Sequence, residues 1–176
     1  MATVPTTQTI AVGEKNLAAE YNSYIRDALS FLLSAPRCQV YQTATTNMST
    51  SGTASVILFD TEQYDTDSMH STSSNTSRIT CNAAGLYVVE ATLGFAANAT
   101  GFRRLDLRKN GGATPFAAVS HAAAPTLSTG VSVTAEVQLS VGDYIEMFGT
   151  QTSGGALASV AGIAWTSFSA RWVANS

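Results

Sequence analysis

An alternation of side-chain type between Ser77 and Phe95 constrains the fold of this chain more than any other feature. From residue 87 to residue 95, every second side chain is apolar, namely Tyr87, Val89, Ala91, Leu93 and Phe95. The intervening positions are Leu86, Val88, Glu90 and Thr92, which form a mixed second face. Only a β-strand keeps a period of two in phase. The stretch therefore predicts a long strand, joined through a turn at Gly85 to a short strand at Arg78–Cys81.

Further short strands separated by turn residues are predicted from Cys38 to the end of the chain. They are Cys38–Thr43, Ser55–Phe59, Arg103–Lys109, Thr114–Val119, Leu127–Leu139, Tyr144–Thr150 and Ile163–Val173. Gly, Asn, Asp, Ser and Pro are frequent between them, which is typical of turns. Such a series with no intervening helix favours a mainly β, antiparallel sandwich, jelly roll or barrel.

The region before the strands divides into an arm and a helix. Residues 1–15 are polar and contain Pro5, which predicts an extended arm. Residues 16–34 predict one helix, with Asn16 as N-cap and Pro36 as its stop. We therefore divide the rest of the chain into an anchoring or oligomerisation helix, residues 16–36, and a head domain, residues 38–176. The apolar stripe of this helix contains Leu17, Tyr21, Tyr24, Ile25, Ala28, Phe31 and Leu32.

This apolar stripe requires a partner, because an isolated helix of this length is marginal in water. Two partners remain open from the sequence. The helix packs either on the sheet of its own domain or on copies of itself around a symmetry axis.

Composition excludes several classes of function. Charged residues make up only 12% of the chain, against about 25% in typical soluble proteins, which favours a surface covered by neighbours. The net charge of −3 argues against a nucleic-acid interface, and no apolar run is long enough to span a membrane. The N-terminus lacks a secretory signal pattern.

Cys38 and Cys81 are expected as buried thiols, with a disulfide between them as the alternative.

The order of the strand motifs resembles the globular head of complement component 1q and the tumour-necrosis-factor superfamily. The stretches that carry the resemblance are VILFD with YD (56–60 and 64–65), RITCNAAGLYVV (78–89), LDLRKNG (105–111), VSVTAEVQLSVGDYIEMF (131–148) and TSFSARWV (166–173). The resemblance covers roughly residues 38–174. It implies an antiparallel jelly-roll sandwich that assembles as a homotrimer.

The first 37 residues carry a second resemblance. The pattern GEKNLAAEYNSYIRDALSFLLSAPR is similar to the N-terminal segment of small virion proteins from phages of actinobacteria. It implies a non-enzymatic structural protein located in the virion, either a capsid decoration or short fibre or a minor tail protein. Its partners would be itself, other virion proteins and a host-surface glycan. The alternative function is a stand-alone trimeric glycan- or ligand-binding module of bacterial or host origin.

Two groups of charged residues are candidate sites in the head. Asp60, Glu62, Asp65 and Asp67 place four hard oxygen ligands in one segment, which makes them a weak candidate for calcium, and turn formation by the Asp side chains is the favoured explanation. Arg103, Arg104 and Arg108 form a candidate surface contact, with an intersubunit ion-pair ladder through Asp106 and a solvated face as the alternatives. We identify no nucleophile–base pair, so no catalytic residue is assigned.

Overall fold

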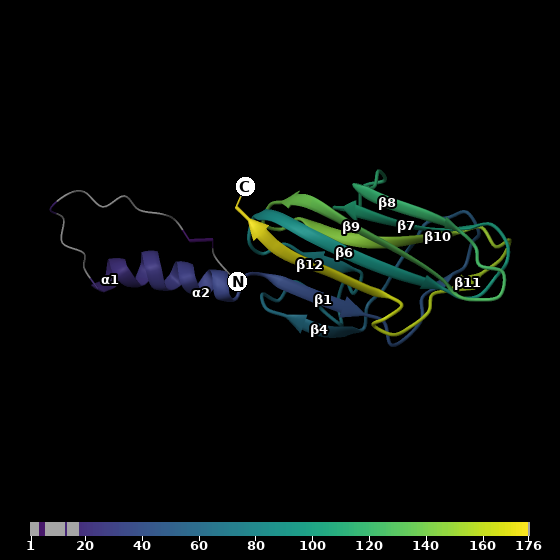
Figure 1. Ribbon diagram of the computed structural model, residues 1–176, viewed down its shortest axis with the longest axis horizontal. Helices are drawn as coiled ribbons and strands as arrows, with labels where there is room; N and C mark the ends of the chain where they lie inside the picture. The colour runs from purple at the N-terminus through teal and green to yellow at the C-terminus, as the bar shows by residue number, and fades with distance from the viewer. Residues whose placement is uncertain (1–3, 6–12, 14–17, 176) are drawn as a thin grey trace.

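The computed structural model describes residues 4–5, 13 and 18–175, and its head is a sandwich of two antiparallel sheets (Figure 1). The first sheet has five strands in the order β4-β1-β12-β6-β9. Their bounds are β1 Arg37–Tyr41, β4 Thr61–Asp65, β6 Gly85–Phe95, β9 Thr129–Leu139 and β12 Ser167–Ala174.

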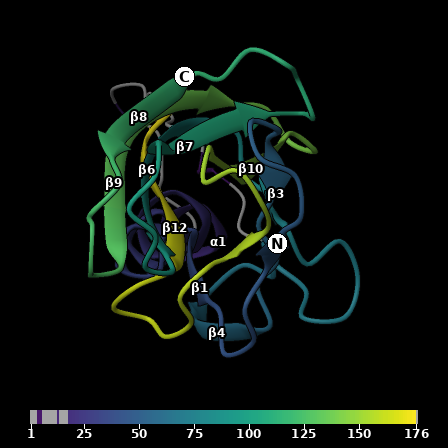
Figure 2. The same cartoon turned by 90° about the vertical axis from the view of Figure 1, so that its right-hand side faces the viewer.

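The second sheet lies across the core from the first (Figure 2). Its strands run in the order β3-β10-β7-β8, and β5 also pairs with β10. Their bounds are β3 Ser55–Val56, β5 Arg78–Thr80, β7 Phe102–Lys109, β8 Ala117–Ala122 and β10 Tyr144–Gln151. A small separate sheet joins β2 Asn47–Met48 to β11 Leu157–Ala158. The mainly β, antiparallel jelly-roll sandwich predicted from the sequence is confirmed.

The alternation in β6 places its apolar face in the core, as predicted. The five side chains Tyr87, Val89, Ala91, Leu93 and Phe95 are all buried. The strand pairs with β9 along its whole length and with β12 on its other side, so it lies inside the first sheet. Residues of the second sheet that face β6 complete the core, among them Leu105, Leu107, Ile145 and Met147.

The predicted strand boundaries need several corrections. The segment Ile163–Val173 becomes a strand only at Ser167, because a turn in which the Trp165 and Thr166 amides donate to the Gly162 carbonyl precedes it. The segment Ser55–Phe59 is a strand only over its first two residues. β4 was not predicted, since three of its five side chains are exposed and it shows no apolar alternation.

A single helical segment precedes the sandwich and extends beyond its end (Figure 1). It consists of α1 Ala18–Tyr21, the π-helical turn η1 Asn22–Arg26 and α2 Asp27–Leu33. These bounds agree with the predicted helix within the residues described. The predicted arm lies outside them except for Val4, Pro5 and Gly13, and so does Leu17 of the predicted stripe.

Both cysteines are free and buried, so the disulfide alternative is wrong. Burial raises the pKa of the Cys38 thiol far above its usual value and also raises the pKa of Cys81. Because the thiolate is the reactive form, we expect neither cysteine to react with a thiol reagent in the native protein at pH 8. Both should react after denaturation, as counted by mass spectrometry. Rapid native labelling would show that the core opens at these sites.

Candidate functional site

The helix presents apolar side chains on two sides. One side faces the head, where Tyr24, Ala28 and Phe31 line a hollow of about 290 Å³ together with Val4, Pro5, Leu32, Trp172 and Asn175. Phe31 is the buried residue of this side. The apolar stripe predicted from the sequence therefore has a first partner within the chain.

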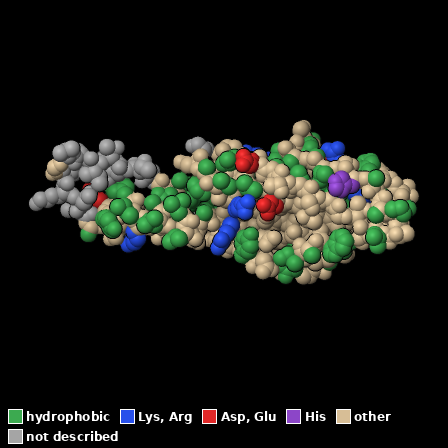
Figure 3. All heavy atoms as spheres, in the orientation of Figure 1, with side chains coloured by type: hydrophobic (Ala, Val, Ile, Leu, Met, Phe, Trp, Pro, Cys, Tyr) green, Lys and Arg blue, Asp and Glu red, His purple; other side chains and the backbone are tan. Residues whose placement is uncertain are grey.

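The other side of the helix is exposed. Tyr21 is 58% exposed, Leu29 54% and Leu33 84%, and Ile25 and Leu32 are also exposed. We call Tyr21, Ile25, Leu29 and Leu33 the outer stripe, and Leu32, which also lines the hollow, lies at its border. Figure 3 shows hydrophobic side chains over much of the visible helix. Contiguous exposed apolar surface of this kind marks an interaction site.

Sequence reasoning missed two members of the outer stripe, Leu29 and Leu33. The predicted stripe assumed an uninterrupted α-helix, whereas the π-turn at Asn22–Arg26 adds one residue to the spacing. Side chains after this turn are therefore rotated relative to those before it. The run FLL at 31–33 is the only sequence signal that could have indicated Leu33.

The base of the helix is fixed to the end of the sandwich. The rings of Phe31 and Trp172 meet edge to face, with centroids 4.9 Å apart. The Trp172 backbone N–H donates to the Pro36 carbonyl at 2.8 Å, and its indole N–H donates to the Ala84 carbonyl at 3.1 Å. Gly85 has a φ of 156°, and a Cβ at this position would overlap the indole of Trp172. These contacts hold the helix in a defined direction relative to the head.

The outer face of the first sheet is rich in small hydroxyl side chains. Thr92, Ser132, Thr134, Ser167 and Ser169 surround Glu90 and, with Gln39, line a hollow of about 210 Å³. This face points towards the viewer in Figures 1 and 3, where most of its central surface is neither hydrophobic nor charged. On this face Arg171 forms an ion pair with Glu90 at 3.5 Å. A flat face with balanced charge suits contact with another protein surface.

Trp165 covers the end of this face that is farthest from the helix. Gly94 and Gly130 are register partners, and the Trp165 ring lies over both, close to where their Cβ atoms would be. The indole is nevertheless 41% exposed, and neighbouring Ile163 is equally exposed. An exposed aromatic residue held over backbone is the type of side chain that anchors protein interfaces.

The structure does not assemble the predicted calcium ligands into one site. Asp60 accepts hydrogen bonds from the backbone N–H groups of Thr43 and Ala44 at 2.8 and 2.7 Å. Burial opposes ionisation of Asp60, but these bonds outweigh it and lower the pKa of its carboxyl group. Glu62 binds His70, and Asp65 binds two backbone N–H groups of the following loop. Among residues 18–175, no group of three acidic, His or Cys side chains is placed to hold a metal ion.

The three arginines predicted as one surface contact have two different roles in the structure. Arg103 is fully buried, so its assignment as a surface contact is wrong. Its guanidinium donates to the carbonyls of Asn98, Thr100 and Phe102 and so fixes the loop before β7. Arg104 and Arg108 flank Asp106 at 2.6 and 3.1 Å, so the ion-pair ladder lies within one chain.

Asp143 closes the turn between β9 and β10. Its carboxylate accepts from Lys109 Nζ, Asn110 Nδ2 and the Ser140 backbone N–H, each at 2.7 Å. These bonds, with Lys109 first, lower the pKa of Asp143 to about 2. The segment Val141–Asp143, within the stretch 131–148 that carries the resemblance, is therefore a structural turn that joins β7 to the β9–β10 connection.

Replacing Asp143 with Asn should remove a pH-dependent part of the stability. Because the folded pKa is below the unfolded value of 3.8, the ionised group stabilises the fold above about pH 4, and this contribution is lost as the pH falls towards 2. We expect the variant to be about 1 kcal/mol less stable at pH 7, after allowing for solvent screening, with a flatter pH dependence below pH 4. Urea unfolding at pH 7 and at pH 2.5 measures the loss of stability and its pH dependence. If the free energy of unfolding changed equally between pH 7 and pH 2.5 in the wild type and in the variant, the role assigned to Asp143 would be contradicted.

No helix among the described residues is long and apolar enough to cross a membrane.

Comparison with known proteins gives matches at the level of structure only. No protein-family model and no curated protein sequence matches the chain. Murine APRIL superposes with a TM-score of 0.61 at 8% identity, covering 78% of this chain and 98% of that one. The globular domain of zebrafish complement 1qA superposes with a TM-score of 0.57 at 16% identity, covering 80% of this chain and 99% of that one. Eiger TNF from S. frugiperda superposes with a TM-score of 0.59 at 12% identity, covering 80% of this chain and 95% of that one. The head of this chain therefore has the jelly-roll fold of the tumour-necrosis-factor and complement 1q globular domains.

Proposed function

We propose that this chain is a homotrimeric structural protein of a phage particle, in which the jelly-roll heads associate and the helix attaches the trimer to the particle. The observation that carries the proposal is the outer stripe of the helix. It remains exposed although the helix base is fixed to the head by Phe31 and Trp172. A stripe that the described part of the subunit leaves uncovered is available to a partner from outside it.

The outer face of the first sheet supports the trimer. It combines the hydroxyl-rich hollow, the exposed Trp165 and a balanced Arg171–Glu90 pair. Tyr64, at 42% exposure, and Val173, at 48%, lie on the strands that border the hollow. A closed cyclic assembly would bury this face repeatedly without leaving unpaired charges. The low charge content of the chain is consistent with such coverage.

The virion location is supported by the similarity of residues 1–37 to the N-terminal segments of small phage virion proteins. The proposed role is assembly and attachment, not catalysis. The stand-alone binding module, the alternative from the sequence, gives no role to the outer stripe. For this reason we favour the particle-bound protein.

Purified particles provide the test. Mass spectrometry of particles banded in a density gradient should detect the chain in stoichiometric amount. Brief chemical cross-linking of the same particles should yield a species containing this chain three times. A chain that stays in the soluble fraction of the lysate, with none in the particle band, would reject the particle-bound role.

A further inference from the structure

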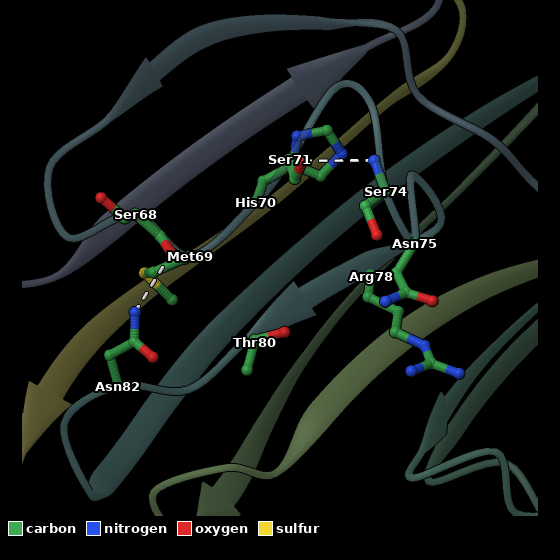
Figure 4. A pocket seen from close by; sticks show the side chains of 9 residues that line it. All are labelled: Ser68, Met69, His70, Ser71, Ser74, Asn75, Arg78, Thr80 and Asn82. Atoms are coloured by element: carbon green, nitrogen blue, oxygen red, sulfur yellow. Dashed lines mark hydrogen bonds between the residues drawn. The ribbon is translucent and has the colours of Figure 1, made fainter.

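A polar hollow opens beside the loop that follows β4 (Figure 4). Its volume is about 310 Å³, at the lower end of the range for small-molecule sites. It is lined by Ser68, Met69, His70, Ser71, Ser74, Asn75, Arg78, Thr80 and Asn82. None of these residues belongs to the first sheet, so the hollow is separate from the face assigned to subunit contact.

The loop on one side of the hollow is held in place by hydrogen bonds although its sequence is polar. The Asp65 carboxylate accepts from the backbone N–H groups of Asp67 and His70 at 3.1 and 2.9 Å. The His70 ring lies 3.0 Å from Glu62 Oε1 and 3.2 Å from the Thr76 carbonyl, and its side chain is fully buried. The hollow therefore has a formed wall before any ligand arrives.

The segment after β5 is hydrogen-bonded to the same loop. The Asn82 amide donates to the carbonyls of Asp67 and Ser68 at 2.7 and 3.1 Å. Ser68 and Asn75 both have left-handed backbone conformations, with φ values of 53° and 51°. These conformations are unfavourable for residues other than glycine, and they turn the chain at both ends of the loop around the hollow.

Several side chains that line the hollow have no hydrogen-bond partner in the protein. Within the described part of the chain, this holds for the hydroxyl groups of Ser68, Ser74 and Thr80 and for the Asn75 amide. They are accessible to water, so they cost nothing when the hollow is empty. Together they present hydroxyl and amide groups that both donate and accept.

Arg78 provides a rigid donor at the edge of the hollow. Its guanidinium stacks on the Tyr144 ring at 4.0 Å, and its Nε donates to Glu146 at 3.3 Å. Glu146 also accepts from the Ser77 hydroxyl at 2.8 Å. The two terminal nitrogens of Arg78 have no partner among the described residues. The planar group can therefore donate to two adjacent oxygen atoms of a ligand.

The charges around the hollow favour a neutral ligand. Glu146 compensates Arg78, and the carboxylates of Glu62 and Asp65 hold the loop beside it, so an anion would gain little from the site. We propose that this hollow binds one ring of a neutral saccharide, with vicinal hydroxyls accepting from Arg78 and others bonded to Asn75 and the three hydroxyl side chains. This activity goes beyond the proposed assembly role and depends on neither the trimer nor the helix.

Saturation-transfer NMR on the full-length protein tests the proposal, using glucose, galactose and N-acetylglucosamine as probes and glucuronic acid and inorganic phosphate for comparison. We expect at least one neutral sugar to bind with a roughly millimolar dissociation constant. Arg78→Lys keeps the charge but loses the planar fork, so it should weaken binding about tenfold. Asn75→Gly keeps the left-handed backbone and removes the amide, and should also weaken binding. Arg104→Lys is the matched control, because Arg104 does not line the hollow, and should leave binding unchanged.

Three outcomes would overturn the proposal. One is the absence of transfer from every neutral sugar at concentrations up to roughly 50 mM, well above the expected constant. Another is binding that is equal in the wild type, Arg78→Lys and Asn75→Gly. The third is stronger binding of phosphate than of any neutral sugar, which would make the hollow an anion site.

Discussion

Replacing Ile25 and Leu29 together with lysine is expected to reduce incorporation of the chain into particles at least about 100-fold while leaving the head folded. Both side chains belong to the outer stripe and are about half exposed in the subunit. Because each is already about half buried, covering the rest of its side chain would contribute about 1 kcal/mol, and lysine would in addition place two charges in that contact. Lysine is a good helix former, so the helix itself should persist.

The matched control is the pair Ser23→Lys and Ser30→Lys. Both serines are exposed on the same helix and lie outside the outer stripe, so the control adds the same charge. We expect near-normal incorporation of the control, measured by quantitative mass spectrometry of gradient-purified particles. If both double variants lost incorporation equally, the effect would be due to the added charge, and the role assigned to the outer stripe would be wrong. Normal incorporation of the Ile25 and Leu29 variant would have the same consequence.

Thr134→Arg is expected to convert the trimer to monomers. Thr134 lines the hollow on the outer face of the first sheet and is the register partner of Glu90. In the isolated subunit, the new arginine can therefore pair with Glu90 at little cost. In the trimer it would fill the space that a neighbour occupies and bury a long charged side chain. The expected cost of several kcal/mol per contact exceeds what a small interface tolerates.

Thr114→Arg provides the comparison for this substitution. Thr114 is exposed in the connection between β7 and β8 of the second sheet, so an arginine there should leave the assembly intact. Sedimentation velocity distinguishes the two variants, and circular dichroism confirms that both are folded. A trimeric Thr134→Arg variant would show that the subunits associate through another surface.

The sequence predicted the sandwich well because its central strands carry their burial pattern in their own side chains. β6 lies between β12 and β9, and its inner residues Tyr87 to Phe95 are all apolar. β9 is an edge strand with the same period, and its inner residues between Val133 and Val137 are only half-buried. The period of two therefore indicated both strands and their inner faces. It did not indicate which one lies at the edge, because pairing order depends on distant segments.

The sites were harder to predict because they depend on contacts between distant residues. Arg103 resembled its neighbours Arg104 and Arg108 in sequence, yet the alternation of β7 directs it into the protein, where three carbonyl oxygens bind it. The four acidic residues were close in sequence, but Asp60 and Asp65 bind separate backbone groups and Glu62 binds the His70 ring. The helix was predicted correctly, whereas the π-turn that rotates its apolar residues leaves no recognisable pattern in the residues 22–26.

The mass of the intact protein in solution tests the central claim most directly. Light scattering coupled to size exclusion, on full-length protein at micromolar concentration, should give about 55 kDa, three times the 18.3 kDa of one chain. The value should persist over a tenfold dilution. A single species of 18.3 kDa under these conditions would contradict the trimer and, with it, the role assigned to the outer face of the first sheet.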